Sequence, residues 1–268
     1  MINITLSTCW YKLKAKFPSE VYSQWIDNML SNVNNYYLVV YTDSESYDFL
    51  KKYESENIKI IIKEMESFYN YKYKDYWIKN HKENYLLKDS VDWKVNMLWS
   101  EKIHFVDETV NKEYFNTDFY GWCDIGYFRN RKCDMSNLEL KNWPAQHKIN
   151  SLHKEKIYYA IVNNDSLYLN QLFMLIQNKN KNGLPEQQLP PNQISIAGGF
   201  FILYKEKLSW WKKTFNDKLQ LYFKHNYLVK DDQIIIIDCI LSNITNFQLT
   251  RENDTRYDNW FLFQRFLS

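Results

Sequence analysis

Asp124, at the end of a short aromatic run, is the residue of this chain best suited to bind a ligand or take part in catalysis. The segment Phe119 to Cys123 reads Phe-Tyr-Gly-Trp-Cys and is followed by Asp124, Ile125 and Gly126. If the run is a buried strand, Asp124 lies at its carboxyl end, where open α/β sheets bind their ligands. A carboxylate there can hold a divalent cation or a ribose hydroxyl, and Gly126 lets the backbone turn sharply beside a bulky ligand. The alternative is an ordinary strand-end turn, in which Asp and Gly are both common.

Three other places carry residue types that could serve the same site. Lys102 falls on the expected helix before this strand and supplies a point charge suited to a diphosphate, although most helix lysines are solvated surface. Gly198 and Gly199 fall inside an expected strand, where glycine marks a bulge or a ligand pressed against the backbone. Asp231 and Asp232 precede an apolar helix, so they either cap its N-terminus or, facing a cleft, act as general base or acceptor ligand.

The elements that must position these residues alternate between strand and helix patterns. Apolar and β-branched runs predict strands, and apolar residues at helical spacing predict helices. The opening βαβαβ series indicates a right-handed, mostly parallel sheet. With no repeat, low-complexity tract or linker, one domain over residues 1–268 is the simplest organisation. We expect strands at 2–8, 36–41, 58–62, 118–123, 157–162 and 194–203, helices at 18–30, 92–110, 166–177, 207–223 and 232–241, a helix opened by a capping box at 42–45, a surface excursion at 129–154 and a flexible loop at 178–192.

The net charge of the chain is close to zero and does not indicate a polyanionic partner. The 268 residues include 34 Lys and Arg against 32 Asp and Glu, a formal net charge of +2, so nothing demands nucleic acid or a membrane surface. The first residues lack the pattern of a signal peptide, and no run reaches the ~18 apolar residues of a membrane span. The four cysteines form no paired motif and are expected to be reduced. We expect a soluble, cytoplasmic protein without a nucleic-acid partner or a membrane span.

Aromatic residues are unusually frequent, at 18% of the chain with 10 Trp. Most are expected to fill the core, but aromatic rings also stack on sugars and bases, so the excess mildly favours a carbohydrate-handling surface. None of the five histidines has a metal-ligand spacing, and the chain contains neither a Gly-x-x-x-x-Gly-Lys loop nor a Gly-x-Ser-x-Gly turn. These absences exclude P-loop enzymes and the familiar serine hydrolases.

The same segments, spread over nearly the whole chain, resemble the HtrL/YibB family of bacterial and viral proteins. The matching residues are Ile4-Thr5-Leu6-Ser7-Thr8, Tyr22 and Trp25, Val39 to Asp43, Lys102, Phe115 to Phe119, Trp122-Cys123-Asp124-Ile125-Gly126 with Arg129, Gly198-Gly199-Phe200, Asp231-Asp232-Gln233 and Tyr257-Asp258-Asn259-Trp260-Phe261. This family is grouped with glycosyltransferases of the GT-A fold. The resemblance implies an α/β fold with a GT-A-like, mostly parallel, mixed sheet flanked by helices, whose N-terminal half is a Rossmann-like nucleotide-binding unit.

The resemblance also implies a glycosyltransferase that moves a sugar from a UDP- or GDP-type nucleotide-sugar donor to a hydroxyl of a glycan or protein. Asp124 stands where other GT-A enzymes carry Asp-x-Asp. The second acid is Gly126 here and no late His is evident, so Asp124 would bind either Mn²⁺ or Mg²⁺ or a ribose. The implied donor-binding residues are Thr8, Tyr11, Lys102, Trp122, Asp124 and Gly126; Gly198, Gly199 and Trp260 would contact sugar or acceptor, and Asp232 or Asp231 would act as base or orient the acceptor.

Two other function classes remain open at this point. A non-catalytic module that binds a nucleotide-sugar or glycan could retain the same fold without turnover. A nucleotidyltransferase would share the sheet, but the chain has no glycine-rich pyrophosphate loop after its first expected strand.

Overall fold

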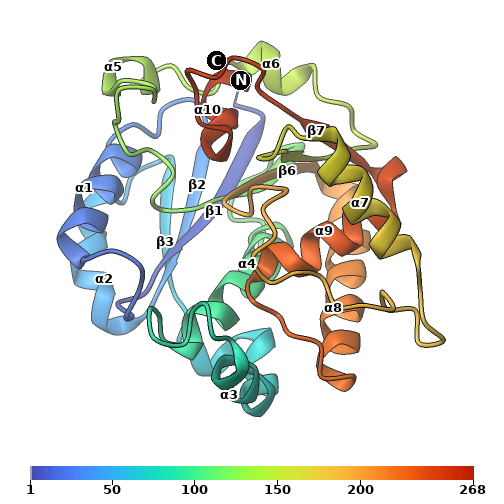
Figure 1. Cartoon of the computed structure of the whole chain (residues 1–268). Helices are drawn as coiled ribbons and strands as arrows, with labels where there is room; N and C mark the ends of the chain where they lie inside the picture. The colour runs from blue at the N-terminus through green and yellow to red at the C-terminus, as the bar shows by residue number, and fades with distance from the viewer. Residues whose placement is uncertain (1) are drawn as a thin grey trace.

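A seven-stranded mixed sheet runs through the molecule (Figure 1). The computed structural model describes residues 2–268. The strand order is β3-β2-β1-β4-β6-β5-β7, with β6 antiparallel to both neighbours and the other neighbouring pairs parallel. The expected α/β class with a mostly parallel sheet is confirmed. The strands are β1 (Ile4–Trp10), β2 (Tyr37–Thr42), β3 (Ile58–Ile62), β4 (Phe119–Cys123), β5 (Ile157–Ala160), β6 (Phe200–Tyr204) and β7 (Phe247–Thr250).

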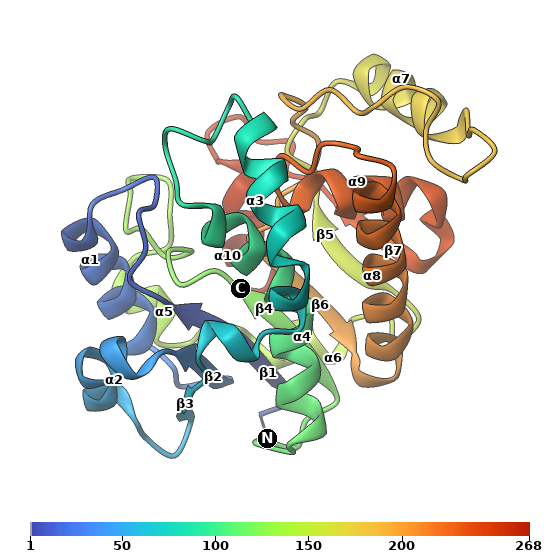
Figure 2. The ribbon, with the colours of Figure 1, turned by 90° about the horizontal axis from the view of Figure 1, so that it is seen from below.

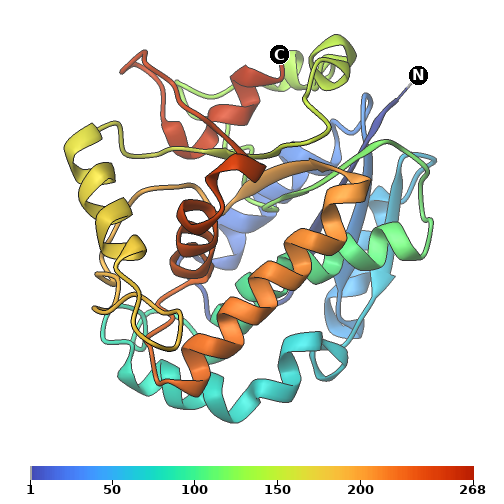
Figure 3. The same ribbon diagram turned by 90° about the vertical axis from the view of Figure 1, so that its right-hand side faces the viewer.

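Helices cover both faces of the sheet. One apolar cluster joins the sheet to α3, α4, α7, α8 and α9, and a second joins the opposite face to α1, α2, α5, α6 and α10. Helices α4 and α8 pack against each other (Figures 2 and 3). The α-helices are α1 (Ser19–Leu30), α2 (Ser44–Leu50), α3 (Lys74–Glu83), α4 (Trp93–Asn111), α5 (Asn137–Leu140), α6 (Gln146–Asn150), α7 (Ser166–Gln177), α8 (Leu208–Lys224), α9 (Asp232–Ser242) and α10 (Leu262–Phe266).

The apolar run of β2 shows why the sheet is buried on both sides. Leu38 and Val40 belong to one core cluster, and Val39 and Tyr41 belong to the other. Successive side chains of a strand point to opposite faces, so a strand covered on both faces is typically an almost continuous apolar run. The continuous run, rather than an alternating one, therefore predicted a central parallel strand correctly.

Several predicted boundaries are confirmed, and two that concern the site are wrong. The helix at 166–177 and the strand at 58–62 match α7 and β3 to the residue. However, β1 extends to Trp10, so Thr8 lies within the strand rather than at its end. The strand expected at 194–203 begins only at Phe200. Before it, the chain makes an isolated bridge between Ile196 and Ile161, and the two glycines form the turn that follows.

Other departures lie outside the site. Asp43, not Thr42, caps α2 by accepting a hydrogen bond from the Ser46 amide, and the Thr42 hydroxyl instead donates to the Trp10 carbonyl. The segment at 129–154 is not purely a surface excursion, because it forms α5 and α6 and buries Trp143. Among the described residues, no helix has both the length and the apolar character that crossing a bilayer requires.

Candidate functional site

A cavity lies where the strand order of the sheet reverses. From β1 the chain continues to β2 on one side, whereas β4 flanks β1 on the other. Open α/β sheets bind ligands at the carboxyl ends of the strands at such a point. A cavity of about 510 Å³ opens there, within the usual size range of small-molecule sites. Its walls come from the segment after β1, from α4, from the turns before β6 and after β4, from the start of α9 and from the chain near residue 260.

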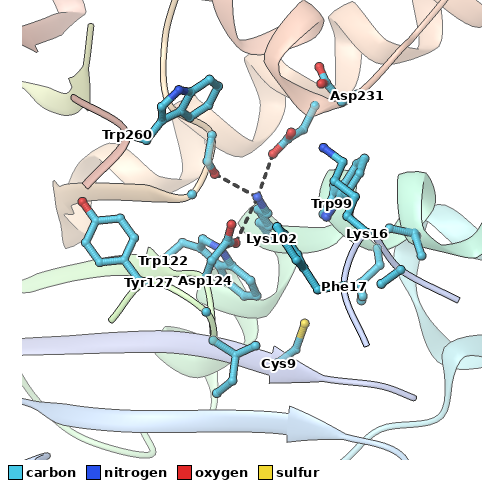
Figure 4. A pocket seen from close by; sticks show the side chains of 18 of the residues that line it. Cys9, Lys16, Phe17, Trp99, Lys102, Trp122, Asp124, Tyr127, Asp231 and Trp260 are labelled. Carbon is cyan, nitrogen blue, oxygen red and sulfur yellow. Dashed lines mark hydrogen bonds and ion pairs between the residues drawn. The ribbon is translucent and has the colours of Figure 1, made fainter. Parts of the chain in front are cut away.

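Lys102 of α4 lies at the floor of this cavity, between two carboxylates. Its Nζ donates a hydrogen bond to the Gly198 carbonyl at 2.8 Å and lies 3.1 Å from Oδ1 of Asp124 and 3.0 Å from Oδ2 of Asp232. Figure 4 draws these contacts as dashed lines that converge on the ammonium group. The residue is only 7% exposed. Lys102 is therefore not a surface lysine but the link between three segments that are distant in the sequence.

Asp124 follows β4, and one of its two carboxylate oxygens is held by protein donors. Its Oδ1 accepts a hydrogen bond of 2.6 Å from Nε1 of Trp122, and its amide donates to the Gly199 carbonyl at 2.8 Å. The Asp124 side chain remains partly exposed to the cavity, unlike those of Lys102 and Asp232. A carboxylate with one oxygen fixed by protein donors can offer the other to a cation or a hydroxyl.

The two glycines give these carboxylates room. A Cβ on Gly198 would lie 3.1 Å from both carboxylate oxygens of Asp232, and a Cβ on Gly199 would lie 3.0 Å from Oδ2 of Asp124. Neither glycine has a backbone in the left-handed region, which among the described glycines Gly183 alone adopts. The pair is therefore explained by close approach of acidic side chains, not by backbone conformation.

Asp232 is the first residue of α9 and Asp231 directly precedes it; the two carboxylates differ in their partners. Oδ2 of Asp231 lies 2.7 Å from Nζ of Lys230, while its Oδ1 is buried without a hydrogen-bond partner. Burial raises the pKa of Asp232 to about 6; the positive charge of Lys102 opposes this shift, and Asp231 and Asp124 add to it. Burial alone would lower the pKa of Lys102, but Asp124 and Asp232 outweigh it and raise that pKa.

The structure brings the predicted site residues to one cavity, with Thr8 as the exception. Tyr11, Trp122, Gly126 and Trp260 line it together with the acidic residues, Lys102 and the glycines. Thr8 is fully buried inside β1 and does not line the cavity. Because β1 runs two residues further than expected, the position at its end belongs to Tyr11.

Two of these lining residues also have structural partners. The Tyr11 hydroxyl donates to the Lys63 carbonyl at 2.8 Å, so Tyr11 presents its ring rather than a free hydroxyl. A Cβ on Gly126 would lie 2.7 Å from the Trp25 ring, so this glycine lets the turn after β4 pack on α1.

Sequence reasoning assigned no site role to a set of basic and aromatic residues that line the same cavity. They come from the segment directly after β1, from α1, from α4 and from the turns after β4 and before α9. Ligands contact the segments that follow parallel strands at the point where the strand order reverses. The residues directly after β1 could therefore have been predicted from their position in the sequence. The residues without an assigned role are Lys16, Phe17, Tyr22, Trp99, Arg129, Arg131 and Lys230.

The donor set for a metal ion is small. In the chain from residue 2 onward, no three His, Cys, Asp or Glu side chains come together as a metal site, and the Lys102 ammonium contacts both Asp124 and Asp232. Asp124 can still offer one carboxylate oxygen. A Mg²⁺ ion is often bound by one or two carboxylates together with substrate phosphates, so these residues fit a cation only in company with a phosphate-bearing ligand.

Comparison with known proteins assigns no family and no function to this chain. No protein-family model matches this chain, and no curated protein sequence is significantly similar to it.

Proposed function

We propose that this protein is a GT-A-like glycosyltransferase, similar to the HtrL/YibB family, that transfers a sugar from a nucleotide-sugar donor to a hydroxyl of a glycan or protein. The observation that carries the proposal is the meeting of Asp124, Lys102 and Asp232 at the floor of one cavity. Three remote segments supply these charges at the strand-order reversal, where nucleotide ligands bind in open α/β sheets. The mixed, mostly parallel sheet supports the same fold group.

Each part of the cavity has a role in this proposal. The Tyr11 and Trp122 rings and the Gly126 turn form the donor side, with Asp124 binding the ribose or a Mn²⁺ or Mg²⁺ ion beside the donor phosphates. Such an ion would neutralise charge on the leaving diphosphate. Gly198, Gly199 and Trp260 border the space for sugar or acceptor.

Proton transfer is assigned to the start of α9. Asp232, or its neighbour Asp231, takes the proton from the acceptor hydroxyl or orients that hydroxyl. A base with a pKa near the working pH is the most effective, and the pKa of Asp232 is raised to about 6 by burial. The bond from the sugar to the diphosphate breaks as the bond to the acceptor oxygen forms, and the diphosphate leaves with the electron pair.

A non-catalytic nucleotide-sugar or glycan-binding module is the second candidate. It is favoured by one observation: the Lys102 ammonium contacts both carboxylates, and an ion-paired carboxylate is a weaker base.

The free thiol state of all four cysteines supports the cytoplasm as the location for either function.

The decisive experiment is a panel of UDP- and GDP-sugars tested with and without Mn²⁺. A glycosyltransferase should show a rise in melting temperature with its donor, since a ligand of the native state stabilises it, and should slowly release nucleoside diphosphate without an acceptor. A binding module would show the melting shift alone. Pyrophosphate release from a nucleoside triphosphate would instead identify a nucleotidyltransferase, and no response to any donor would contradict the proposal.

A further inference from the structure

We propose that Arg129, rather than Lys102, is the residue that binds the diphosphate group of the ligand. That the bound diphosphate belongs to a nucleotide-sugar donor rests on the proposed function. The presence of a site for a phosphate-type anion beside Arg129 rests on the geometry of the cavity alone.

The charge at the cavity floor argues against a diphosphate at Lys102. An ammonium group has three N–H donors, and the Lys102 Nζ already has three oxygens at 2.8–3.1 Å. Lys102 contributes one positive charge, while Asp124 and Asp232 contribute two negative charges when ionised. The trio therefore carries a net charge of about −1, and a diphosphate placed against it would meet a like charge at short range.

Arg129 has the opposite properties. Its Nε donates to the Gly126 carbonyl at 2.9 Å, and among residues 2–268 no carboxylate pairs with it and no acceptor bonds its terminal Nη1 and Nη2 groups. The guanidinium carbon lies 4.2 Å from the ring centre of Trp25, 4.8 Å from that of Phe261 and 5.5 Å from that of Phe17. The rings fix the plane of the guanidinium, and Arg129 lines the cavity.

An unpaired cation in this position needs an anion. Burial, together with the nearby positive charge of Arg131, lowers the pKa of Arg129, yet an arginine stays protonated at neutral pH. The site therefore holds a partly desolvated positive charge whose free N–H groups form a planar fork. That fork matches two oxygens of a phosphate, and such charge-assisted bidentate contacts are the strong ones.

The other basic residues of the cavity differ from Arg129 in their partners. The Arg131 guanidinium is bonded to two carboxylates, and Lys230 is paired with the adjacent aspartate. Lys16 has no carboxylate partner among the described residues and lies on the same cavity, but its side chain is exposed. Lys16 thus adds charge at the mouth, and Arg129 supplies the fixed contact.

The test compares the wild type with Arg129→Gln, using inorganic pyrophosphate and UDP or GDP as probes and the bare nucleoside as reference. Binding is measured by titration calorimetry at low salt, and folding by the melting temperature without ligand. We expect Arg129→Gln to raise the Kd of pyrophosphate and of the diphosphates by roughly tenfold to a hundredfold, with little change for the nucleoside. Arg256→Gln is the charge-matched control, because Arg256 is exposed and lies outside the cavity.

Arg129→Lys covers the case in which Arg129→Gln fails to fold. It keeps the charge and removes the fork, so the diphosphate affinity should fall and depend more strongly on salt. Unchanged pyrophosphate and diphosphate affinity in a folded Arg129 variant would overturn the inference, as would a wild type that binds neither probe. Arg129-dependent pyrophosphate binding without turnover of any nucleotide-sugar would support the anion site while contradicting the glycosyltransferase proposal.

Discussion

Nζ of Lys102 and Oδ2 of Asp232 lie 3.0 Å apart and join two helices, α4 and α9, beneath the cavity. Both side chains are almost entirely buried. Removing one partner of a buried ion pair leaves the other charge without compensation, which costs far more than the pair contributes when intact. This contact therefore links the stability of the fold to the charge state of the site.

Lys102→Met should strongly destabilise the protein. The substitution keeps the length of the side chain but leaves Asp124 and Asp232 without their shared cation, at a cost of about 3–5 kcal/mol. Urea unfolding measures the change. Lys213→Met is the control, because Lys213 forms an exposed pair with Asp217 and exposed pairs contribute little. Equal stability of the two variants would show that Lys102 is not a structural cation.

Asp124→Asn should abolish most of the sugar transfer while the protein stays folded. The amide keeps the shape of the side chain and its oxygen can still accept from Trp122, but it loses the charge that would bind a cation or position a ribose. We expect a loss of about 2–4 kcal/mol in transition-state stabilisation, as for other electrostatic contacts of this kind. Asp118→Asn, at the opposite end of β4 where Asp118 pairs loosely with surface lysines, should keep wild-type turnover. Full activity of Asp124→Asn would reduce Asp124 to a turn residue.

The activity should depend on pH through Asp232. Burial raises the pKa of this carboxyl to about 6, so a base role predicts that kcat/KM rises as the pH increases through about 6. Asp232→Asn should lower the rate and remove this rise, whereas a wild-type profile that is flat from pH 5 to 8 would speak against Asp232 as the base.

The same pKa sets the sign of a stability change. The folded protein binds the Asp232 proton more tightly than the unfolded chain, whose ordinary pKa is 3.8. Stability from this group is therefore present below about pH 4 and is lost as the pH rises towards 6. The unfolding free energy of the wild type, minus that of Asp232→Asn, should fall between pH 4 and pH 7. A difference that rises over this interval would contradict the assigned direction.

Gly199→Ala should reduce activity more than stability. The added methyl would lie 3.0 Å from Oδ2 of Asp124, and this partly exposed carboxylate can move aside. Displacement of a catalytic group by about 1 Å can cost on the order of a hundredfold in rate. Gly183→Ala is the matched control: its φ of +77° makes alanine cost about 1–2 kcal/mol, with normal activity per folded molecule. If Gly199→Ala loses stability but not specific activity, the glycine pair is structural.

The sequence alone determined most of the helices and strands and the position of Asp124 at the end of a strand. Apolar periodicity is a local property, so β3 and α7 could be located to the residue and the continuous run of β2 predicted a doubly covered strand. Asp124 could be placed at a strand end because it is the first charged residue after the aromatic and apolar run of residues 119–123. Where the local signal was ambiguous, as at Gly198 and Gly199, the prediction of a strand failed: small residues in an apolar run fit either a strand or a turn.

Only the tertiary structure decided how the charges are paired. Lys102, Asp124 and Asp232 meet because the crossovers of the sheet bring α4, the end of β4 and the start of α9 to one point. The distances between these side chains leave no local pattern in the sequence. The sequence therefore could not show that Lys102 contacts two carboxylates, or that Arg129 lies among three rings with no carboxylate partner in residues 2–268. The residue types follow from the chain, but the partner of each charge is set by long-range packing, because electrostatic energy depends on separation in space and on burial.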